Sequence, residues 1–211
     1  MSDSKPLKER ILDAALQLFE RYGYHGVTVN QIVAECSASK GGFYHNFSSK
    51  DELLYEIHDY FISYVLEKAK RAFEECATPT EKLVAVIQSF VKVFHMYKAH
   101  ITVFYQESMY LRPEYKEAIA TKRDEFRTIM RAVIVEGVQS GEFREELNID
   151  ITVMSILGTV NWTYKWYQPN GASTIEEIAE LYIDLILHSI LTNDAKVNKQ
   201  YAHFFRKIPC I

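Results

Sequence analysis

The chain has 211 residues, of which 48% are hydrophobic, with only eight glycines and five prolines. This composition excludes a disordered chain and predicts a helix-rich globular protein of one or two domains. The net charge is −4, divided into +1 for residues 1–50 and −5 for the remainder, which excludes a broad basic surface. Any nucleic-acid binding would then depend on a few specific contacts with phosphates.

The sequence lacks the marks of a membrane or disulfide-rich protein. No apolar run approaches the roughly 18 residues that span a bilayer, and no signal peptide is recognisable. Cys36, Cys76 and Cys210 are odd in number and widely spaced, which fits neither a disulfide framework nor a metal site. We therefore expect a cytoplasmic protein with inert thiols, no metal, no cofactor and no membrane partner.

The first predicted helix covers about residues 8–22. Its apolar residues recur at helical spacing and Gly23 follows as a stop signal. They are Ile11, Leu12, Ala15, Leu16, Leu18 and Phe19.

Residues 28–47 predict two short helices joined by a tight turn. Thr28 and Gln31 have the spacing of a capping box, residues 36–38 supply the turn, and Ser39 is placed to cap the second helix. Two short helices in this order are typical of a helix-turn-helix that reads DNA.

The second short helix carries the residues expected to touch DNA. Gly41 and Gly42 each cost about 1 kcal/mol of helix propensity, which favours a backbone that approaches another molecule closely. We expect Lys40 to reach base edges in the major groove and Lys50 to contact a phosphate. The full predicted set is Thr28, Ser39, Lys40, Gly41, Gly42, Tyr44, His45 and Lys50.

A longer pattern runs through this region and into the next helix. It reads Phe19-x-x-x-Gly23-Tyr24, then Gly26-Val27-Thr28-Val29-x-x-Ile32, then Ser39-Lys40-Gly41-Gly42-Phe43-Tyr44-His45-x-Phe47-x-x-Lys50-x-x-Leu53. Over residues 8 to about 54 the chain thereby resembles the TetR family of transcriptional repressors. The resemblance implies an all-α fold, with a three-helix DNA-binding head at residues 1–48 and a ligand-binding and dimerisation body at residues 49–211.

Capping signals divide the body into six helices, with no credible strand. They begin at Ser49, where residues 49–52 have the spacing of a capping box, at Thr78, after the break at residues 95–100, at Arg112, at Asn148 or Asp150, and at Thr174. The third of them is short and ends near Tyr110, and the last ends near Thr192. No element is predicted in the tail at residues 193–211, although its aromatic residues Tyr201, Phe204 and Phe205 suggest that it docks.

The helices expected at residues 149–167 and 175–191 are apolar on two sides. A body of about 150 residues can bury both sides most simply against a second copy, as a four-helix interface around a two-fold axis. The predicted interface residues are Trp162, Trp166, Leu181, Tyr182, Leu185 and Ile186. A homodimer also suits a palindromic operator, whose half-sites lie about 34–36 Å apart.

Aromatic residues crowd into residues 90–110, where they fit either an ordinary core or the lining of an apolar pocket. Residues 158–171, followed by Glu176-Glu177-Ile178-Ala179, resemble TetR-family members that sense acyl-coenzyme A. That resemblance implies that the acyl chain lies among the aromatic residues and that the phosphates of the coenzyme lie near cationic side chains. Each of these cationic side chains could equally be an ordinary charged group on the solvated surface. The ligand-binding candidates are Phe90, Phe94, Phe104, Tyr105, Tyr110, Arg123, Arg127, Trp162, Lys165 and Trp166.

Two other functions are weighed against this one. An enzyme is not expected, because the histidines are dispersed and no nucleophile elbow or P-loop occurs. A multidrug-sensing repressor of an efflux pump is the alternative regulator, and it would need an acidic residue in the pocket, for which Glu107 is the candidate. We expect a repressor that leaves its operator when it binds a hydrophobic small molecule. The preferred candidate for this molecule is an acyl-coenzyme A.

Overall fold

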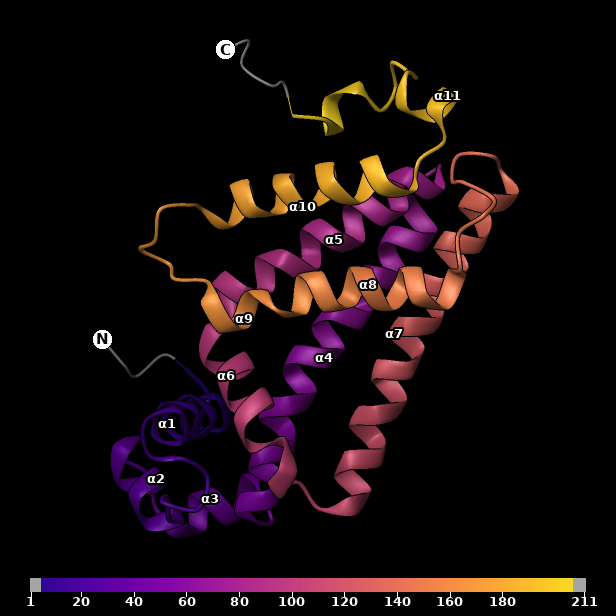
Figure 1. Ribbon diagram of the computed structural model, residues 1–211. Helices are drawn as coiled ribbons and strands as arrows, with labels where there is room; N and C mark the ends of the chain where they lie inside the picture. The colour runs from indigo at the N-terminus through magenta and orange to yellow at the C-terminus, as the bar shows by residue number, and fades with distance from the viewer. Residues whose placement is uncertain (1–4, 207–211) are drawn as a thin grey trace. The chain divides into compact units, whose positions relative to one another are not determined.

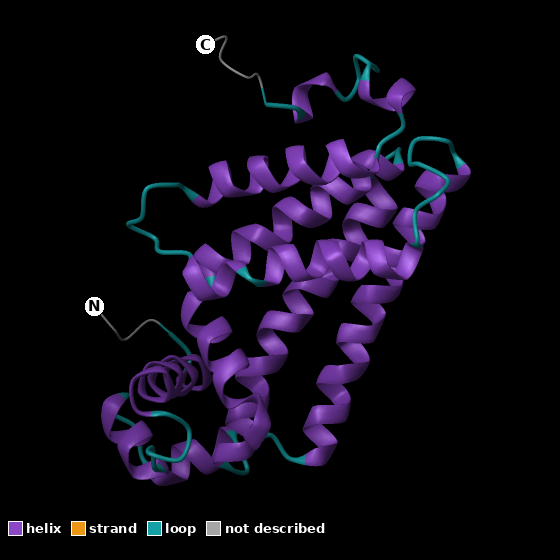
Figure 2. Cartoon of the chain, viewed as in Figure 1, coloured by secondary structure: helices purple, strands orange, loops and turns teal. Residues whose placement is uncertain are grey.

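The computed structural model describes residues 5–206, and within that range it is built from α-helices (Figures 1 and 2). The one pairing of the β type among these residues is an isolated antiparallel bridge between Phe143 and Leu191. The predicted all-α class is confirmed.

The chain forms two compact units. The first contains the chain up to Ser63 together with Tyr97–Thr121, and the second contains Tyr64–Met96 and everything from Lys122 onward. The division falls inside two long helices, α4 (Lys50–Glu75) and α7 (Pro113–Gln139). In this division α6 and the first turns of α4 group with the head, and the functional boundary expected at residue 48 stays a prediction.

The first unit is built around α1. Besides the starts of α4 and α7, its helices are α1 (Leu7–Tyr22), α2 (Val29–Glu35), α3 (Lys40–Asn46), α6 (Lys98–Glu107) and the 3-10 turn η1 (Ser108–Tyr110). Helix α1 packs against α2, α3 and α6. The core is made by large apolar side chains from several of these helices, and it includes Ile11, Ala15, Phe19, Val27, Ile32, Phe43, Phe47 and Leu53.

Local capping fixes the ends of the short head helices. The Thr28 hydroxyl accepts from the Gln31 amide at 3.3 Å, and the Gln31 side chain accepts from the Thr28 amide at 2.8 Å, which confirms the capping box. At α4 only half of the expected box is present. Ser49 accepts from the Glu52 amide at 3.1 Å, but the Glu52 carboxylate accepts from Ser48 instead.

The second unit holds the remaining helices. They are α5 (Pro79–Met96), α8 (Ile149–Asn161), α9 (Thr163–Trp166), α10 (Ile175–Ile190), α11 (Asn193–Lys196) and the 3-10 turn η2 (Ala202–Phe204), with the later parts of α4 and α7. Helix α10 lies along α5, and α8 contacts both (Figure 1). Capping boxes begin α5 at Thr78 and α10 at Thr174, as predicted.

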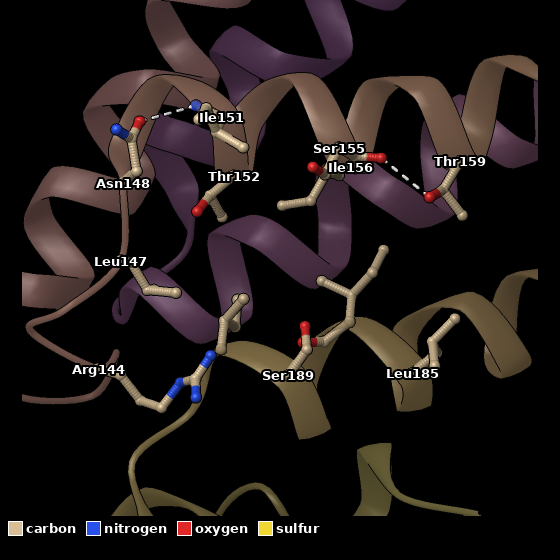
Figure 3. Close-up of a pocket in the computed structure, with 12 residues that line it drawn as sticks. Arg144, Leu147, Asn148, Ile151, Thr152, Ser155, Ile156, Thr159, Leu185 and Ser189 are labelled. Carbon is tan, nitrogen blue, oxygen red and sulfur yellow. Dashed lines mark hydrogen bonds between the residues drawn. The ribbon is translucent and has the colours of Figure 1, made fainter.

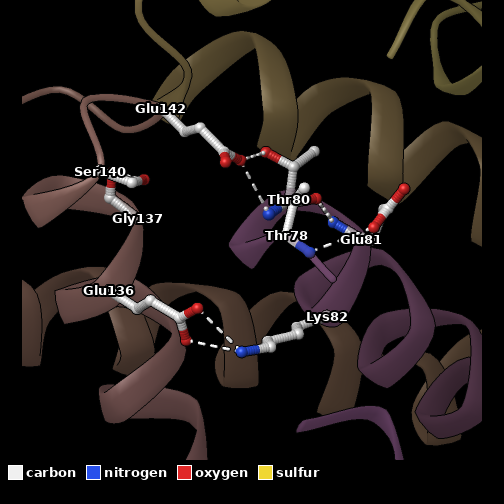
Figure 4. Close-up of polar contacts among 8 residues, drawn as sticks. All are labelled: Thr78, Thr80, Glu81, Lys82, Glu136, Gly137, Ser140 and Glu142. Carbon is white, nitrogen blue, oxygen red and sulfur yellow. Dashed lines mark hydrogen bonds and ion pairs between the residues drawn. The ribbon is translucent and has the colours of Figure 1, made fainter. Parts of the chain in front are cut away.

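Two polar contacts fasten α5 to α7 and the turn after it (Figure 4). The Thr80 amide and hydroxyl donate to the Glu142 carboxylate at 3.1 and 2.6 Å. The buried Lys82 ammonium donates to both oxygens of Glu136 at 2.8 Å and lies 4.6 Å from the centre of the Phe73 ring. Both anchors join residues more than 50 positions apart, so they fix tertiary rather than local structure.

The helix count differs from the nine expected, because residues 5–206 contain eleven α-helices and two 3-10 turns. The helix expected over residues 149–167 is interrupted at Trp162, whose amide donates to the carbonyls of Gly158 and Val160. The predicted docking of the tail finds support in Tyr201, which is buried, and in Gln200, which donates to Glu81 at 3.1 Å. Four-residue helices such as α9 and α11 are too short to leave a periodic pattern.

Candidate functional site

The turn between α2 and α3 is set by backbone geometry and by one side chain of α1. Ser37 adopts φ +52°, a left-handed conformation, and the Ala38 amide donates to Val33 O at 2.8 Å. The Arg10 guanidinium donates to the carbonyl of Cys36 at the end of α2. Arg10 was not predicted as a site residue, since nothing in the local pattern connects it to a turn 26 residues away.

Helix α3 presents one exposed face. Its buried side is Phe43, whereas Lys40, Gly41, Tyr44 and His45 are all exposed. These four positions follow the spacing i, i+1, i+4 and i+5, so they lie on the same side of the helix.

The helix ends that flank this face are exposed too. Ser39 accepts from the Gly42 amide at 3.0 Å and so caps α3, and Thr28 caps α2. The structure therefore brings six of the eight predicted DNA-binding residues to exposed positions on α3 and the two capped helix ends: Thr28, Ser39, Lys40, Gly41, Tyr44 and His45.

The two glycines of α3 serve different purposes. A Cβ at Gly41 would meet nothing closer than Ser39 Oγ at 3.8 Å, so this position is open. A Cβ at Gly42 would lie 3.0 Å from Leu7 Cδ2. The packing of α1 against α3 thus gives Gly42 a second reason to lack a side chain, and the approach of both glycines to DNA stays a prediction.

Lys50 makes contacts within the head. Its ammonium donates to the carbonyl oxygens of Tyr24 at 2.8 Å and Val27 at 2.7 Å, and it lies 4.1 Å from the centre of the Tyr24 ring. Partial burial lowers the pKa of Lys50. The Tyr24 hydroxyl donates to Asp51, and burial followed by this hydrogen bond raises the pKa of Tyr24. These internal contacts use two of the three donors of the ammonium, and the phosphate contact expected of Lys50 stays a prediction.

In the first unit, the ligand-binding candidates have different surroundings. Phe104 is buried, with its ring centre 5.1 Å from that of His58, and Tyr105 is half-buried. Tyr110 packs on the turn after α1, with its ring centre 4.2 Å from that of His25, and its ligand role stays a prediction. Glu107 is buried beside the same turn, where a Cβ at Gly23 would lie 3.5 Å from its carboxylate.

The aromatic candidates of the second unit belong to a packed cluster. Phe90 and Phe94 are buried, and the ring of Phe90 lies 5.4 Å from that of Phe126. Both candidates therefore fit the ordinary core as well as they fit a pocket lining.

The cationic candidates are all at the surface. Arg123, Arg127 and Lys165 are exposed, and Arg127 is paired with Asp124 at 2.9 Å. No contact in the structure distinguishes them as phosphate ligands.

Helices α8 and α10 expose a long apolar face. Side chains 61–65% exposed lie along it at Ile151, Trp162 and Leu185, and Met154, Trp166 and Leu181 are exposed as well. Of the other predicted interface residues, Ile186 is buried within the chain, and the half-buried Tyr182 hydroxyl lies 3.1 Å from Thr163 Oγ1. Exposed apolar surface of this extent on a folded chain is typical of a surface that another protein covers.

A groove of about 290 Å³ separates α8 from α10 within this face (Figure 3). Thr152, Ser155 and Thr159 line one side, Leu185 lines the other, and Arg144 lies at one end with a buried Nε that has no hydrogen-bond partner. Trp162 and Trp166 were expected both at the dimer interface and in the ligand pocket. Their exposure favours the interface over a buried pocket.

Metal and membrane features can be stated for the described part of the chain. Over residues 5–206, no cluster of three His, Cys, Asp or Glu side chains is suited to a metal ion. None of the helices in that range has both the length and the apolar character needed to cross a bilayer. Cys36 and Cys76 are free thiols, and Cys210 lies outside the described residues.

Comparison with known families gives two matches. Residues 11–57 match the family described as bacterial regulatory proteins, tetR family, and residues 76–190 match the family described as tetracyclin repressor-like, C-terminal domain. The second match alone spans more than half of the chain.

Several individual proteins are similar over most of their length. The HTH-type transcriptional repressor KstR2 of Mycolicibacterium smegmatis is 24% identical over 185 residues, which cover 87% of this chain and 90% of the relative. The fatty acid metabolism regulator protein of Bacillus subtilis is 24% identical over 90% of this chain and 98% of its own. The crystal structure of AibR in complex with isovaleryl coenzyme A and operator DNA has a TM-score of 0.75 and 25% identity, and covers 85% of this chain and 97% of AibR.

Proposed function

The chain belongs to the TetR family of bacterial regulatory proteins, and from this membership we propose that it is a homodimeric repressor released from its operator by an acyl-coenzyme A. DNA binding through the helix-turn-helix is the family's activity and the chain is a regulator rather than an enzyme. The palindromic operator, the dimer and the inducer are the parts proposed here.

The exposed face of α3 carries the DNA-binding part of the proposal. Lys40 can donate to a guanine edge in the major groove, a contact worth about 1–3 kcal/mol of discrimination. Tyr44 and His45 lie on the same face, and the capped starts of α2 and α3 offer amides near phosphates. Lys50 remains in this set as a phosphate contact, and its ammonium also donates to two carbonyls within the head.

The apolar face of α8 and α10 supports a second copy as the partner. A two-fold arrangement would cover Trp162 and Leu185 with the same face of the other subunit. It would also supply the two heads that a palindrome requires.

Two relatives support the inducer class. One is named for fatty acid metabolism, and AibR was crystallised with isovaleryl coenzyme A and operator DNA. In the second unit the buried aromatic residues Phe90 and Phe94 are suited to an acyl chain, and the exposed Arg123 and Lys165 are available for phosphates. The multidrug alternative receives no comparable support, because its candidate acid Glu107 lies beside Gly23 in the head's own unit.

Operator selection and ligand screening test the proposal. The operator is first selected from a library of random duplexes, and a palindrome bound by two chains is the expected result. The pure protein is then heated with acyl-coenzyme A of several chain lengths, with coenzyme A alone and with cationic dyes. A ligand at 100 times its dissociation constant stabilises the folded state by about 2.7 kcal/mol, so an inducer should raise the melting temperature.

A binding cycle separates induction from simple binding. If the acyl thioester releases DNA, saturating operator must weaken acyl thioester binding by the same factor, usually about 5- to 150-fold. Equal affinities with and without operator for every acyl thioester would contradict the proposed induction. Stabilisation by cationic dyes alone would favour the multidrug alternative.

A further inference from the structure

The turn between α2 and α3 contains a residue in an unfavourable backbone conformation. Within residues 5–206, Ser37 is the single residue other than glycine that has a positive φ, at +52°. Residues with a β carbon adopt this left-handed conformation only at a cost in free energy. The Ser37 side chain is exposed, so its own packing does not hold the backbone there. Contacts made by the neighbouring backbone must do so.

The peptide group that joins Cys36 to Ser37 is held at both ends. Its carbonyl, on Cys36, accepts from the Arg10 guanidinium of α1, and its amide, on Ser37, donates to the carbonyl of Ala34 at 3.2 Å. The carbonyls at the end of a helix lack helical partners and favour a cationic donor. Arg10 supplies that donor to the end of α2.

The hydrogen bond from Arg10 and the positive φ of Ser37 depend on each other. The φ angle of a residue changes when the peptide group before it rotates. A half-turn of the Cys36–Ser37 peptide would make φ of Ser37 negative, but it would also point the Cys36 carbonyl away from Arg10 and the Ser37 amide away from Ala34. Arg10 therefore stabilises the orientation of the peptide that requires the left-handed residue.

The direction of this turn decides where α3 begins. Ser39, the cap of α3, lies two residues after Ser37, and Lys40 follows it as the first residue of the helix. The first turn of α1 touches α3 as well, because a Cβ at Gly42 would lie 3.0 Å from Leu7 Cδ2. The start of α1 thus contacts both the turn and the helix that the turn leads into.

We propose that Arg10 is a positioning residue for DNA recognition, which fixes the left-handed turn at Ser37 and thereby the direction of α3. The proposal rests on the family's DNA binding and not on the inducer or the dimer. It concerns one of the five N–H donors of the guanidinium, and it is compatible with phosphate contacts made by the others.

A glycine at position 37 provides a rescue that separates this role from a direct DNA contact. We expect Arg10→Met to weaken binding to the selected operator about tenfold, in keeping with the loss of one charge-assisted hydrogen bond. In a Ser37→Gly background the same change should weaken binding less than about threefold, because glycine adopts a positive φ readily. Binding is measured far below the melting temperature, where a change in global stability alone leaves operator affinity unaltered.

Ser37→Ala is the matched control, because it removes the hydroxyl but keeps the β carbon. In that background Arg10→Met should still weaken binding about tenfold. An equal loss in the Ser37→Gly and Ser37→Ala backgrounds would overturn the proposal, since glycine cannot replace a contact between Arg10 and DNA. An operator affinity unchanged by Arg10→Met would overturn it too.

NMR of the DNA-free protein tests the turn without an operator. The three-bond coupling between Ser37 Hα and the Cys36 carbonyl carbon is large for a positive φ and small for a negative one. It should be large in the wild type and reduced in Arg10→Met. Arg21→Met, which removes an exposed arginine from the same helix, should leave it large. A coupling that Arg10→Met does not change would contradict the positioning role.

A measurement on the wild-type protein covers the case in which Arg10→Met does not fold. Scalar coupling across the hydrogen bond between Arg10 Nη2 and the Cys36 carbonyl carbon should be detectable, together with the large coupling at Ser37. A Ser37 coupling typical of a negative φ in the wild type would refute the proposal.

Discussion

A buried histidine in α4 makes the stability of the protein depend on pH. The His58 side chain is fully buried, its Nδ1 lies 2.8 Å from the carbonyl oxygen of Leu54, and its Nε2 has no hydrogen-bond partner. The carbonyl requires the proton to be on Nδ1, so the neutral ring leaves Nε2 as an unpaired acceptor. Burial lowers the pKa of His58 from 6.5 to about 4.

The sign and size of the effect follow from proton linkage. Because the folded-state pKa lies below the unfolded-state value, the unfolded chain takes up the proton first as pH falls. The stability due to the neutral ring is complete above pH 6.5 and is lost between 6.5 and about 4. For this single group, the free energy of unfolding should fall by about 2 kcal/mol from pH 7 to pH 5 and by roughly 3 kcal/mol in total.

Replacement of His58 by leucine isolates this contribution. Urea unfolding of the wild type and of His58→Leu at pH 7 and pH 5 should show that the variant lacks about 2 kcal/mol of the acid-induced loss. His45→Leu, an exposed histidine on α3, is the control and should keep the wild-type pH dependence. If the wild type and His58→Leu lose stability in parallel between these pH values, the reasoning about the buried neutral ring is wrong.

Three further substitutions test other features. In Gly137→Ala the new Cβ would lie 2.1 Å from the Phe143 ring, so overpacking should lower the free energy of unfolding by about 1–3 kcal/mol in urea titrations; an unchanged midpoint would contradict this packing. Lys82→Met leaves the Glu136 carboxylate without its ammonium partner and should cost about 1–3 kcal/mol, whereas an equally stable variant would show the pair to be dispensable. Leu185→Glu places a charge on the exposed face of α10 and should give a folded monomer by sedimentation and circular dichroism; a dimer of wild-type stability would place the interface elsewhere.

The sequence was most informative where the determining contacts are local. The capping boxes at Thr28, Thr78 and Thr174 each depend on a partner three residues away, and all three are confirmed. The exposed face of α3 follows from helical periodicity within a single helix. The capping pattern at α4 failed only in its second half, because Glu52 reaches back one residue further than the pattern requires.

The contacts that the sequence did not reveal depend on distant partners. Lys50 bonds to residues 23 and 26 positions earlier, and Gly42 is constrained by Leu7, 35 positions earlier. A motif specifies which residue types occur but not which of them face inward. Tyr110 shows the same limit, since an aromatic residue in an aromatic-rich segment proved to pack on the α1–α2 turn.

The contact between Gly42 and Leu7 also bears on how a new operator preference could be engineered. In α3, position 42 is closed by α1, position 43 belongs to the core, and the Asn46 side chain donates to the Gly42 carbonyl at 2.8 Å. A combinatorial library aimed at altered base preference should therefore randomise positions 40, 41, 44 and 45 alone. A side chain at position 42 would require Leu7 to move, and a polar one at position 43 would enter the core.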